Sequence, residues 1–546
     1  MSSHMSSHDP LSLPGPPPRT SASSSSSIVD EIIESFSFSA DDVRVTAAHL
    51  LEQLKTGLLH DSLPFQHPSF VTTIPDGSET GRFLSVDLGG TNCRICLVDL
   101  HGDGTFSIEQ QKHAVPQNIS LAGGTLLHWD KGWDIPSALG RDPCALLQAA
   151  TNAQQLPVHV AALANDSVGS LLTRAYTSTS VTARTLACVI VGTGTNAAYV
   201  ERLQNVKRVG CINAATDTVM AMNTEWGCMD DDMRVLPRTR FDDMVDVQST
   251  DCGLQMLEKR VSGLYLGELL RLAVLELYQR GDIFDMHVGQ DPLLFTKESI
   301  DASLLSALAV DDSDDAMTAK IKFVADTLGA ENVSTADVHI IQAIANAIVT
   351  RAARLVGAAT AAIVLQSGFL STEAEAAVPT VLTAEKDGTH VATKVVQDAV
   401  PAALVPDSSA RTLLQRAFDI LTAPFARCFG MSRPKTKTKT KTDLISSLTS
   451  PSPSPSLSPS PSTLSSPGLM KQPPTSSPAI PIIDIGVTGS VIEHHPTFEK
   501  EMRAALRQEP GIGPVGDARI RTGLCEDGSA VGAALMVHAA MAQKNA

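Results

Sequence analysis

The sequence predicts an α/β protein with two similar half-domains, and three observations support this prediction. The stretch FLSVDLGGTNCRICLVD (83–99) has two apolar runs separated by glycines, which is typical of two strands joined by a tight turn. The same order of strand, Gly/Thr turn and strand returns at 186–202, around GTGTN. The chain has 546 residues, of which 43% are hydrophobic, enough for two globular domains and some unstructured segments.

The turn of the first hairpin has the chemistry to bind phosphate. Gly89 and Gly90 allow backbone conformations that other residues avoid. Their N–H groups, with Thr91 and Asn92, would form a concave set of donors for phosphate oxygens. Asp87, at the strand end, would reach a magnesium ion or its water ligands. An ordinary β-hairpin explains this stretch equally well, and it is the repeat in the second hairpin that favours two turns holding one phosphate chain.

Charge and cysteine content argue against several functional classes. The net charge of −17 and the pI of about 5.3 disfavour nucleic acid and anionic membranes as partners. An acidic protein can still bind a nucleotide through a few local donors and magnesium. The nine cysteines are scattered, and we expect no secretory leader and no membrane insertion. A cytoplasmic protein in a reducing compartment is therefore the expectation.

The N-terminal part of the chain should pass from disorder into a helix and then into strands. Residues 1–27 are rich in Ser, Pro and His and should be disordered. Ser39 and Asp42 resemble a capping box ahead of an amphipathic helix that ends near Gly57. After the first hairpin, the pattern predicts a strand at 105–115 and a helix at 142–153.

Polar residues stand at a predicted strand-to-helix junction in the middle of the chain. A strand at 158–163 would lead into Asn165 and Asp166, and a helix would follow at 167–176. Folds of the α/β class place their chemistry at such junctions. A second polar loop, NTEWG at 223–227, follows an apolar run.

The second half of the chain combines long helices, a low-complexity segment and a return to strands. A helix or helix pair at 253–278 carries Glu258, and the Ala-rich segment 336–364 predicts a buried helix. Residues 372–479 contain KTKTKTKT and PSPSPSLSPSPS, a composition that cannot bury a core. Order should resume with a strand and Gly-rich turn at 480–490, a helix from Thr497, a strand at 519–522 and a last helix opening at 526–529.

Eight blocks of the sequence are similar, in order, to the eukaryotic hexokinases, and the last two, with RIRTGL between them, look most like the fungal glucokinase branch. The blocks are FLSVDLGGTNCR, WDKGWDIP, LANDSVG, VGTGTNAAY, MNTEWG, EKRVSGLYLGELLR, DIGVTGSVIEHHP and EDGSAVGAALM. They cover most of residues 30–370 and 480–546. The resemblance implies an actin-like, hexokinase-type (ribonuclease H-like) α/β fold, in which a small and a large lobe close a cleft over ATP and a hexose.

This resemblance implies a division of the chain into lobes and unstructured parts. The expected parts are a disordered N-terminal tail at 1–27, an N-terminal helical part of the large lobe at 28–80, a small lobe at 81–166, more of the large lobe at 167–371, a mostly disordered low-complexity insertion at 372–479, and large-lobe strands with the C-terminal small-lobe helix at 480–546.

Three departures from the family pattern stand out. The family normally has several dozen residues, including a strand, at the point that corresponds to 116/117. The loss of a strand would expose unpaired backbone groups, and a mispredicted exon boundary explains the gap as simply as a real deletion. Asp130 stands where the family usually has threonine, and Thr488 replaces the usual Asp of its DGS turn.

The resemblance assigns roles to residues that match the family's motifs. Asp166, in LANDSVG, would accept the proton of the sugar 6-hydroxyl as general base, although a helix N-cap is its simpler structural role. Lys131 matches a lysine that acts in catalysis and sugar binding. The other sugar ligands would be Asn165, Asn196, Glu225 and Glu258. The ATP ligands would be Asp87, Gly89, Gly90, Thr91, Asn92, Arg94, Gly192, Thr193, Gly194, Gly489 and Ser490.

The implied activity is ATP-dependent phosphorylation of a hexose at its 6-hydroxyl, with glucose converted to glucose 6-phosphate. Mg²⁺ would be carried by ATP, with no direct protein ligand, and Asp87 would reach it through water. Two alternatives stay open: a catalytically impaired, hexokinase-like sugar sensor, and a kinase for N-acetylglucosamine. The expected partners are the hexose and ATP, without nucleic acid, and the chain would be a monomer or a homodimer.

Overall fold

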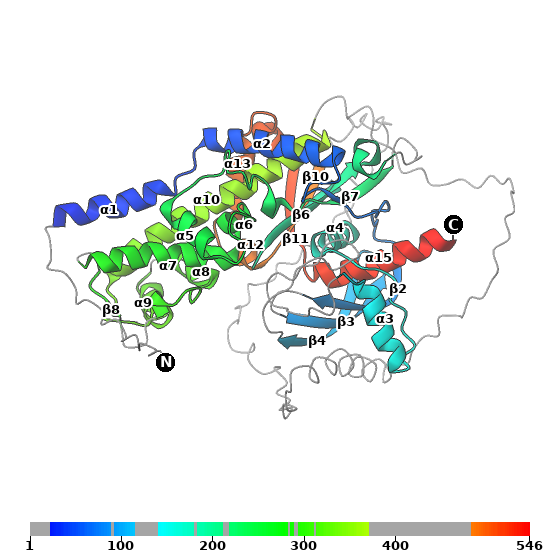
Figure 1. Cartoon of the computed structure of the whole chain (residues 1–546), viewed down its shortest axis with the longest axis horizontal. Helices are drawn as coiled ribbons and strands as arrows, with labels where there is room; N and C mark the ends of the chain where they lie inside the picture. The colour runs from blue at the N-terminus through cyan, green and yellow to red at the C-terminus, as the bar shows by residue number, and fades with distance from the viewer. Residues whose placement is uncertain are drawn as a thin grey trace, which may run out of the picture.

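Two β-sheets organise the protein (Figure 1). This computed structural model describes residues 22–88, 92–114, 140–178, 183–210, 218–281, 284–288, 293–310, 313–370 and 482–545. The larger sheet has the order β1-β7-β6-β5-β10-β11 and the smaller the order β2-β3-β4. The strands of the larger sheet are β1 (His67–Pro68), β5 (Ala183–Val191), β6 (Thr195–Arg202), β7 (Val219–Asn223), β10 (Ile482–Thr488) and β11 (Ile520–Leu524).

Strand direction differs between the two sheets. In the larger sheet β5, β10 and β11 are parallel, and β1, β7, β6 and β5 pair antiparallel. The smaller sheet is antiparallel throughout and contains β2 (Thr80–Leu88), β3 (Asn92–His101) and β4 (Phe106–Ala114). The predicted strand after the first hairpin is therefore confirmed. A separate two-stranded ribbon pairs β8 (His287–Val288) with β9 (Ala330–Glu331).

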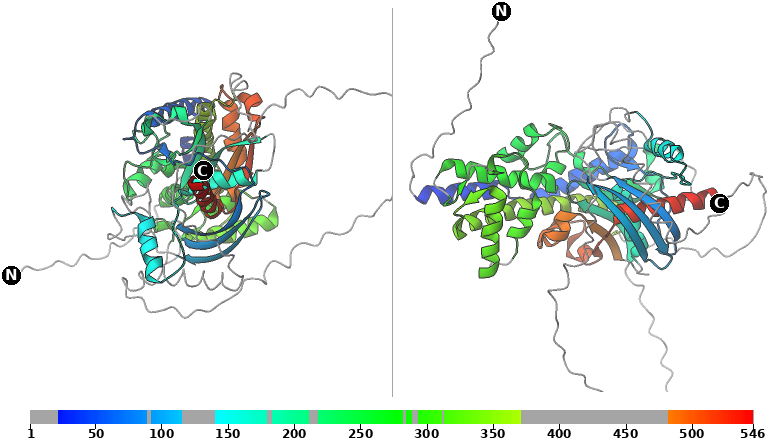
Figure 2. Two further views of the ribbon diagram at one scale, coloured as in Figure 1. Left: turned by 90° about the vertical axis from the view of Figure 1, so that its right-hand side faces the viewer. Right: turned by 90° about the horizontal axis from the view of Figure 1, so that it is seen from below.

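Helices α4 (Asp166–Thr177) and α15 (Gly528–Asn545) lie between the two sheets. Helix α4 packs on β5 and β6, while α15 packs on α4 and on β2. Figure 2 shows the three-stranded sheet with α15 at one end of the molecule and α1, α7 and α9 at the other. A large lobe around the six-stranded sheet and a small lobe around the three-stranded sheet therefore meet through this helix pair.

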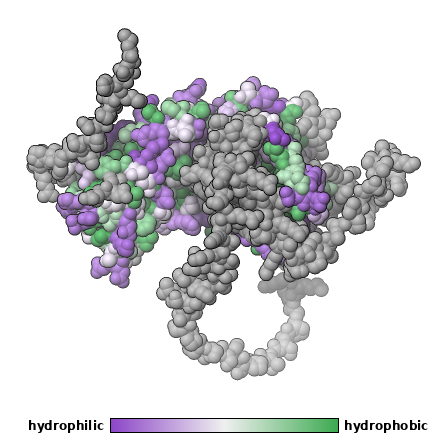
Figure 3. Space-filling model, turned by 60° about the horizontal axis from the view of Figure 1, so that its bottom comes forward, coloured by the Kyte–Doolittle hydropathy of each residue, from purple (hydrophilic) through white to green (hydrophobic). Residues whose placement is uncertain are grey.

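The remaining helices build the large lobe, apart from α3, which lies in the chain between β4 and α4. Their bounds are α1 (Ala22–Ser35), α2 (Ala40–Leu59), α3 (Pro143–Ala153), α5 (Arg240–Gln248), α6 (Glu258–Val261), α7 (Gly263–Arg280), α8 (Ala302–Leu308), α9 (Asp314–Leu328), α10 (Thr335–Ser367), α12 (Ser490–His494), α13 (Phe498–Gln508) and α14 (Gly513–Asp517). Helix α10 is central, because it contacts β5 and β6 of the sheet as well as α2, α7 and α13. On the face that Figure 3 shows, hydrophilic and hydrophobic residues are mixed over the coloured part of the surface.

The apolar composition of α10 is explained by its packing. Its length and hydropathy are those of a helix that could cross a membrane, but 83% of its most apolar window is buried inside the protein. Residues such as Ile348, Ala352 and Val356 have no more than 1% of their surface exposed. The predicted buried helix at 336–364 is thus confirmed.

Capping signals predicted helix starts accurately. Ser39 caps α2 through its hydroxyl, which accepts from the Asp42 N–H, and the Asp42 carboxylate accepts from the Ser39 N–H in return. Asp142 caps α3 in a similar way, through the N–H of Cys144. The helix pair at 253–278 starts later than predicted, with α6 at Glu258 and α7 at Gly263.

Two predictions are wrong. Helix α1 begins at Ala22, inside the segment 1–27 that was predicted to be disordered; its C-terminal part is anchored by buried Ile32, so the helix extends back through the serines. No strand forms at 158–163 in the described chain between α3 and α4. There, the Gln148 side chain donates to the Val158 carbonyl and accepts from the Val160 N–H, so these backbone groups bond to a side chain instead of a neighbouring strand.

Several predictions concern residues outside the described part of the chain. They are the turn residues Gly89, Gly90 and Thr91, the junction at 116/117, the loop that contains Asp130 and Lys131, and the insertion at 372–479. Of Asn92, only the backbone is described, at the start of β3.

Glycines allow α4 and α15 to approach closely. A Cβ atom on Gly532 would lie 2.1 Å from the Cα atom of Gly169, and one on Gly528 would lie 2.5 Å from the Ser170 hydroxyl. These separations are far below van der Waals contact, so no larger residue fits without moving a helix. The two glycines of α15 and Gly169 of α4 therefore set the distance between the lobes.

Replacing Gly532 with alanine should destabilise the fold. The added Cβ forces α4 and α15 apart, and overpacking of this kind costs about 1–3 kcal/mol, only partly offset by the better helix propensity of alanine, worth about 1 kcal/mol. Urea unfolding measures the difference. The control is Met541→Ala on the same helix, where the side chain is 52% exposed; its stability should match the parent. Equal stability of Gly532→Ala and the parent would contradict this packing argument.

Candidate functional site

The N-terminus of α4 presents Asn165, Asp166 and Ser167 between the lobes. Asn165 is the N-cap, and its side-chain oxygen accepts from the Ser167 N–H (2.9 Å) and hydroxyl (2.6 Å). Asp166 is the first residue of the helix, exposed to solvent, and its Oδ1 also accepts from the Ser167 N–H (2.8 Å). The N-cap role expected as the simpler alternative for Asp166 therefore belongs to Asn165, which leaves Asp166 available to a ligand.

Three asparagine amides converge on one oxygen of Glu225. The Oε1 atom of Glu225 accepts from Asn223 at 2.8 Å and, over longer distances, from Asn196 at 3.4 Å and Asn165 at 3.5 Å. These residues come from the end of β7, the start of β6 and the N-cap of α4. Glu225 itself has a left-handed backbone conformation, φ +47°, at the turn after β7. The fold thus brings distant polar residues to one point.

Glu258 joins this group from α6. Its Oε2 atom accepts from the Thr195 N–H at 3.0 Å, next to Asn196 in the chain. The indole N–H of Trp226 donates to the Thr195 hydroxyl (3.0 Å), which fixes the same corner of β6. The structure therefore brings together Asn165, Asn196, Glu225 and Glu258, the predicted sugar ligands that it describes. Amide and carboxylate groups in pairs are suited to sugar hydroxyls, which need donors and acceptors together.

The pKa of Asp166 is raised to about 6. Loss of hydration is the largest cause, and the negative charges of Glu225 and Asp87 add to it, while the hydrogen bond from the Ser167 N–H acts in the opposite direction. Although water still reaches Asp166, the carboxylates gathered around it disfavour its charged form. A carboxylate with a pKa close to neutral is well suited to accept a proton.

Asp87 and Arg94 link the small-lobe sheet to the start of α15. Arg94 donates to Asp87 through Nε (2.9 Å) and Nη2 (2.5 Å), and to Asp527 through Nη1 (2.9 Å). The Ser529 hydroxyl donates to Asp87 Oδ2 (2.8 Å). The neighbouring carboxylates also raise the pKa of Arg94, although burial opposes this. Both predicted ATP residues therefore lie together at the lobe junction, but their charges are directed at each other and at α15.

The second Gly/Thr turn faces the turn after β10. Within Gly192–Gly194 the Gly192 N–H donates to the Gly194 carbonyl (2.9 Å), and α7 starts against this turn, with the Gly263 N–H donating to the Gly192 carbonyl (2.7 Å). A Cβ on Gly192 would lie 3.5 Å from the Gly489 Cα. Gly489 has φ +110°, and a Cβ there would meet the Val191 carbonyl at 2.5 Å. The predicted ATP residues at 192–194 and at 489–490 are therefore neighbours.

Thr488 preserves the turn in which the family usually has aspartate. Its hydroxyl donates to the Glu493 carboxylate at 3.0 Å, and the Gly489 N–H donates to the same oxygen at 2.7 Å. Glu493 thus holds the turn closed from within α12, so the departure from the family pattern does not open it.

Sequence reasoning missed Asn223 and Asp527. Asn223 lies at the centre of the amide–carboxylate group, and Asp527 shares Arg94 with Asp87. Their motifs, NTEWG and EDGS, can be identified in the sequence, but the residues to which Asn223 and Asp527 bond come from distant segments of the chain. Ser529, in the same motif as Asp527, bonds to Asp87.

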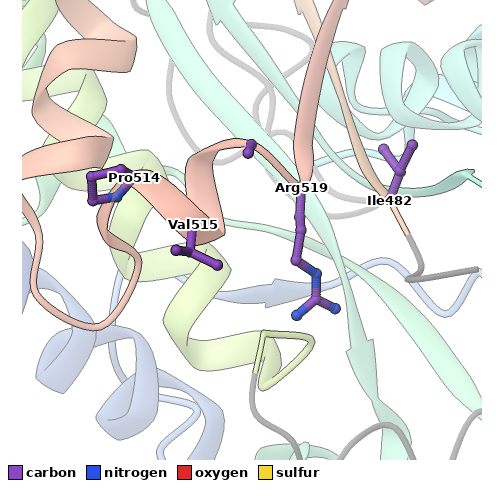
Figure 4. A pocket seen from close by; sticks show the side chains of 5 residues that line it. Ile482, Pro514, Val515 and Arg519 are labelled. Atoms are coloured by element: carbon purple, nitrogen blue, oxygen red, sulfur yellow. The ribbon is translucent and has the colours of Figure 1, made fainter.

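A separate apolar pocket lies away from these groups (Figure 4). Ile482, Pro514, Val515, Ala518 and Arg519 line it at the outer edge of the larger sheet. Arg519 is engaged by the carbonyls of residues 369 and 370 over 3.4–3.5 Å. This pocket lacks the convergent polar groups of the site at α4. Among the described residues, no group of three or more His, Cys, Asp and Glu side chains could hold a metal ion.

Comparisons with known proteins agree with this arrangement. Two family models described as Hexokinase match the chain, one at 186–394 and 468–539, the other at 28–122 and 118–176. The second match is split beside the junction at 116/117. Glucokinase of Aspergillus niger is 30% identical over 94% of this chain and 97% of its own. Glucokinase-1 of Saccharomyces cerevisiae is 30% identical over 63% of this chain and 84% of its own.

Solved structures share the fold. Hexokinase from Schistosoma mansoni, complexed with glucose, aligns with a TM-score of 0.63 and 22% identity over 96% of this chain and all of that one. A second hexokinase crystal structure aligns with a TM-score of 0.61 and 19% identity over 95% of this chain and 99% of that one. The chain therefore belongs to the hexokinase family, with its two-lobed actin-like fold and with fungal glucokinases among its relatives.

Proposed function

We propose that this chain is an ATP-dependent hexose kinase that converts glucose to glucose 6-phosphate. The observation that carries the proposal is the convergence of Asn165, Asn196, Glu225 and Glu258 beside a carboxylate, Asp166, whose pKa is raised to about 6. The glucokinase and hexokinase names of the relatives support the same reaction.

In the proposed reaction, the amide and carboxylate groups of the large lobe bind the sugar hydroxyls. Asp166 accepts the proton of the 6-hydroxyl as that oxygen forms its bond to the γ-phosphorus of ATP and ADP leaves. The turns at 192–194 and 489–490 would hold the nucleotide, together with the turn that follows Asp87. Closure of the lobes would exclude water, so transfer to the sugar is favoured over hydrolysis.

A magnesium ion fits this site through the nucleotide. Asp87 is the described carboxylate at the first phosphate turn, and its Oδ2 atom already accepts from Arg94 and Ser529. These bonds make it a better partner for a metal-bound water than a direct ligand. The ion would neutralise charge on the β- and γ-phosphates. We also propose a cytoplasmic location, on the evidence of the scattered cysteines and acidic composition.

Replacing Asp166 with asparagine should abolish most turnover. Asparagine keeps the shape of the side chain but cannot accept the proton, and loss of a general base costs about 10²–10⁴-fold in rate. Coupled-enzyme assays of glucose 6-phosphate formation measure turnover, and calorimetry measures glucose binding, which should persist. If the parent binds glucose but shows no turnover, the sugar-sensor alternative is favoured. If the parent turns over N-acetylglucosamine but not glucose, the N-acetylglucosamine kinase alternative is favoured.

The activity should depend on pH in the way Asp166 dictates. Because its pKa is raised to about 6, the carboxylate is protonated below that pH and cannot act as a base. We expect kcat/KM to be level above about pH 7 and to fall about tenfold per pH unit below 6. The control is Glu331→Gln, an exposed carboxylate outside the site, which should keep the parent profile. A profile that stays level down to pH 4.5 would refute this assignment.

Replacing Gly489 with alanine should weaken ATP binding selectively. Gly489 has φ +110°, and the added Cβ would collide with the Val191 carbonyl. Backbone strain of this kind costs about 1–3 kcal/mol. The turn must shift, so KM for ATP should rise about tenfold or more, while glucose binding stays near the parent value. Gly210→Ala is the matched control, since its φ is +76° and no atom of the described residues lies within 4 Å of a Cβ there. An equal rise of KM for ATP in Gly489→Ala and Gly210→Ala would contradict this assignment, because it would show a general effect of backbone strain.

A further inference from the structure

Asn223 links several elements of the site through its side chain, and the predicted sugar ligands do not include it. It ends β7 and is 8% exposed. Its Nδ2 atom donates to Glu225 Oε1 at 2.8 Å, and its Oδ1 atom accepts from Asn196 Nδ2 at 2.9 Å and from the Ser167 hydroxyl at 3.2 Å. The amide oxygen of Asn223 therefore bonds to β6 and α4, and its amide nitrogen bonds to the turn after β7.

The orientation of these amides follows from their partners. Asn196 Oδ1 accepts from the Ala197 N–H at 2.7 Å, so its Nδ2 must face Asn223 and Glu225. Asn223 then has to present its oxygen to Asn196 and its nitrogen to Glu225. The Glu225 N–H also points to Asn223 Oδ1, at 3.4 Å. These partners fix the orientations of the Asn196 and Asn223 amides.

We propose that Asn223 is a positioning residue that sets Glu225 and Asn196 for the sugar before the sugar binds. This inference rests on the proposed role of Glu225 and Asn196 as sugar ligands. Without Asn223, Glu225 loses its 2.8 Å hydrogen bond and keeps the longer ones from Asn196 and Asn165. More of the ordering of its carboxylate then falls to the sugar, and that ordering subtracts from binding. Asn223 acts through these two residues and needs no contact with the sugar.

The first test is Asn223→Ala. Glucose affinity is measured without ATP, by calorimetry or by tryptophan fluorescence, to which Trp226, buried beside the site, contributes. We expect glucose Kd and KM to rise about 10–100-fold, while KM for ATP stays within about twofold. The matched control is Gln66→Ala, which removes another fully buried amide, one that bonds to Tyr199 in β6, and it should leave glucose affinity unchanged.

The second test is Asn223→Asp, which keeps the shape and replaces the donor with a second carboxylate facing Glu225. A proton shared by the two carboxylates restores the missing donor. Two other acidic groups lie near this pair: Asp166 of α4, whose charge interacts with that of Glu225, and Glu258 of α6, which accepts from the Thr195 N–H next to Asn196. Relative to the parent at each pH, glucose binding by Asn223→Asp should recover at least fivefold between pH 8 and pH 6, whereas Asn223→Ala should show no recovery.

Each outcome decides the proposal. Selective loss of glucose affinity with recovery at low pH in the aspartate variant supports it. Unchanged glucose affinity in Asn223→Ala, an equal loss in Gln66→Ala, an equal rise in KM for ATP, or no recovery in Asn223→Asp would each overturn it. If the parent chain itself binds no glucose, the sugar-site assignment fails and this inference fails with it, whereas normal binding by the parent confines the failure to Asn223.

Discussion

The close contact of α4 and α15 is the constraint on which the rest of the structure depends. Helix α4 belongs to the large lobe and carries Asp166 at its first position, and α15 packs on β2 of the small lobe. Gly532 lies against the backbone of Gly169, so the helices meet without intervening side chains. Because α4 and α15 are in such close contact, Asp166 on α4 lies near the Asp87–Arg94 pair of the small lobe.

The far end of α4 is fixed by a buried charge. Arg174 donates twice to Asp484 at 2.7 Å, and Arg521 donates to the same carboxylate at 2.7 Å. Asp484 is fully buried, and its pKa is lowered, since these cations outweigh the burial that opposes ionisation. The helix is thus tied to β10 and β11, the strands that lead to the Gly489 turn and to α15. Positions of the base and of the nucleotide turns are therefore linked through one strand pair.

Sequence reasoning succeeded where the signal was local. The capping box at Ser39, the second Gly/Thr turn and the polar residues at Asn165 and Asp166 could be predicted from neighbouring residues, and the structure contains each of them. It failed where distant partners decide. The segment 158–163 is apolar enough for a strand, but Gln148 takes its backbone bonds. Nothing in the sequence around Asn223 distinguishes it from an ordinary loop asparagine, because its partners lie on β6 and α4.

The carboxylates of the site would repel each other and the phosphates of ATP if they were left alone. Arg94 offsets two of them, Asp87 and Asp527, and the asparagine amides donate to Glu225. Asp166 accepts only a backbone N–H among the bonds described, and its pKa is raised first by loss of hydration and then by the charges of Glu225 and Asp87. The uneven sharing of donors therefore separates the roles: Arg94 and the asparagine amides hold the other carboxylates in place, while Asp166, which has no such partner among the bonds described, is the group suited to take up a proton near neutral pH.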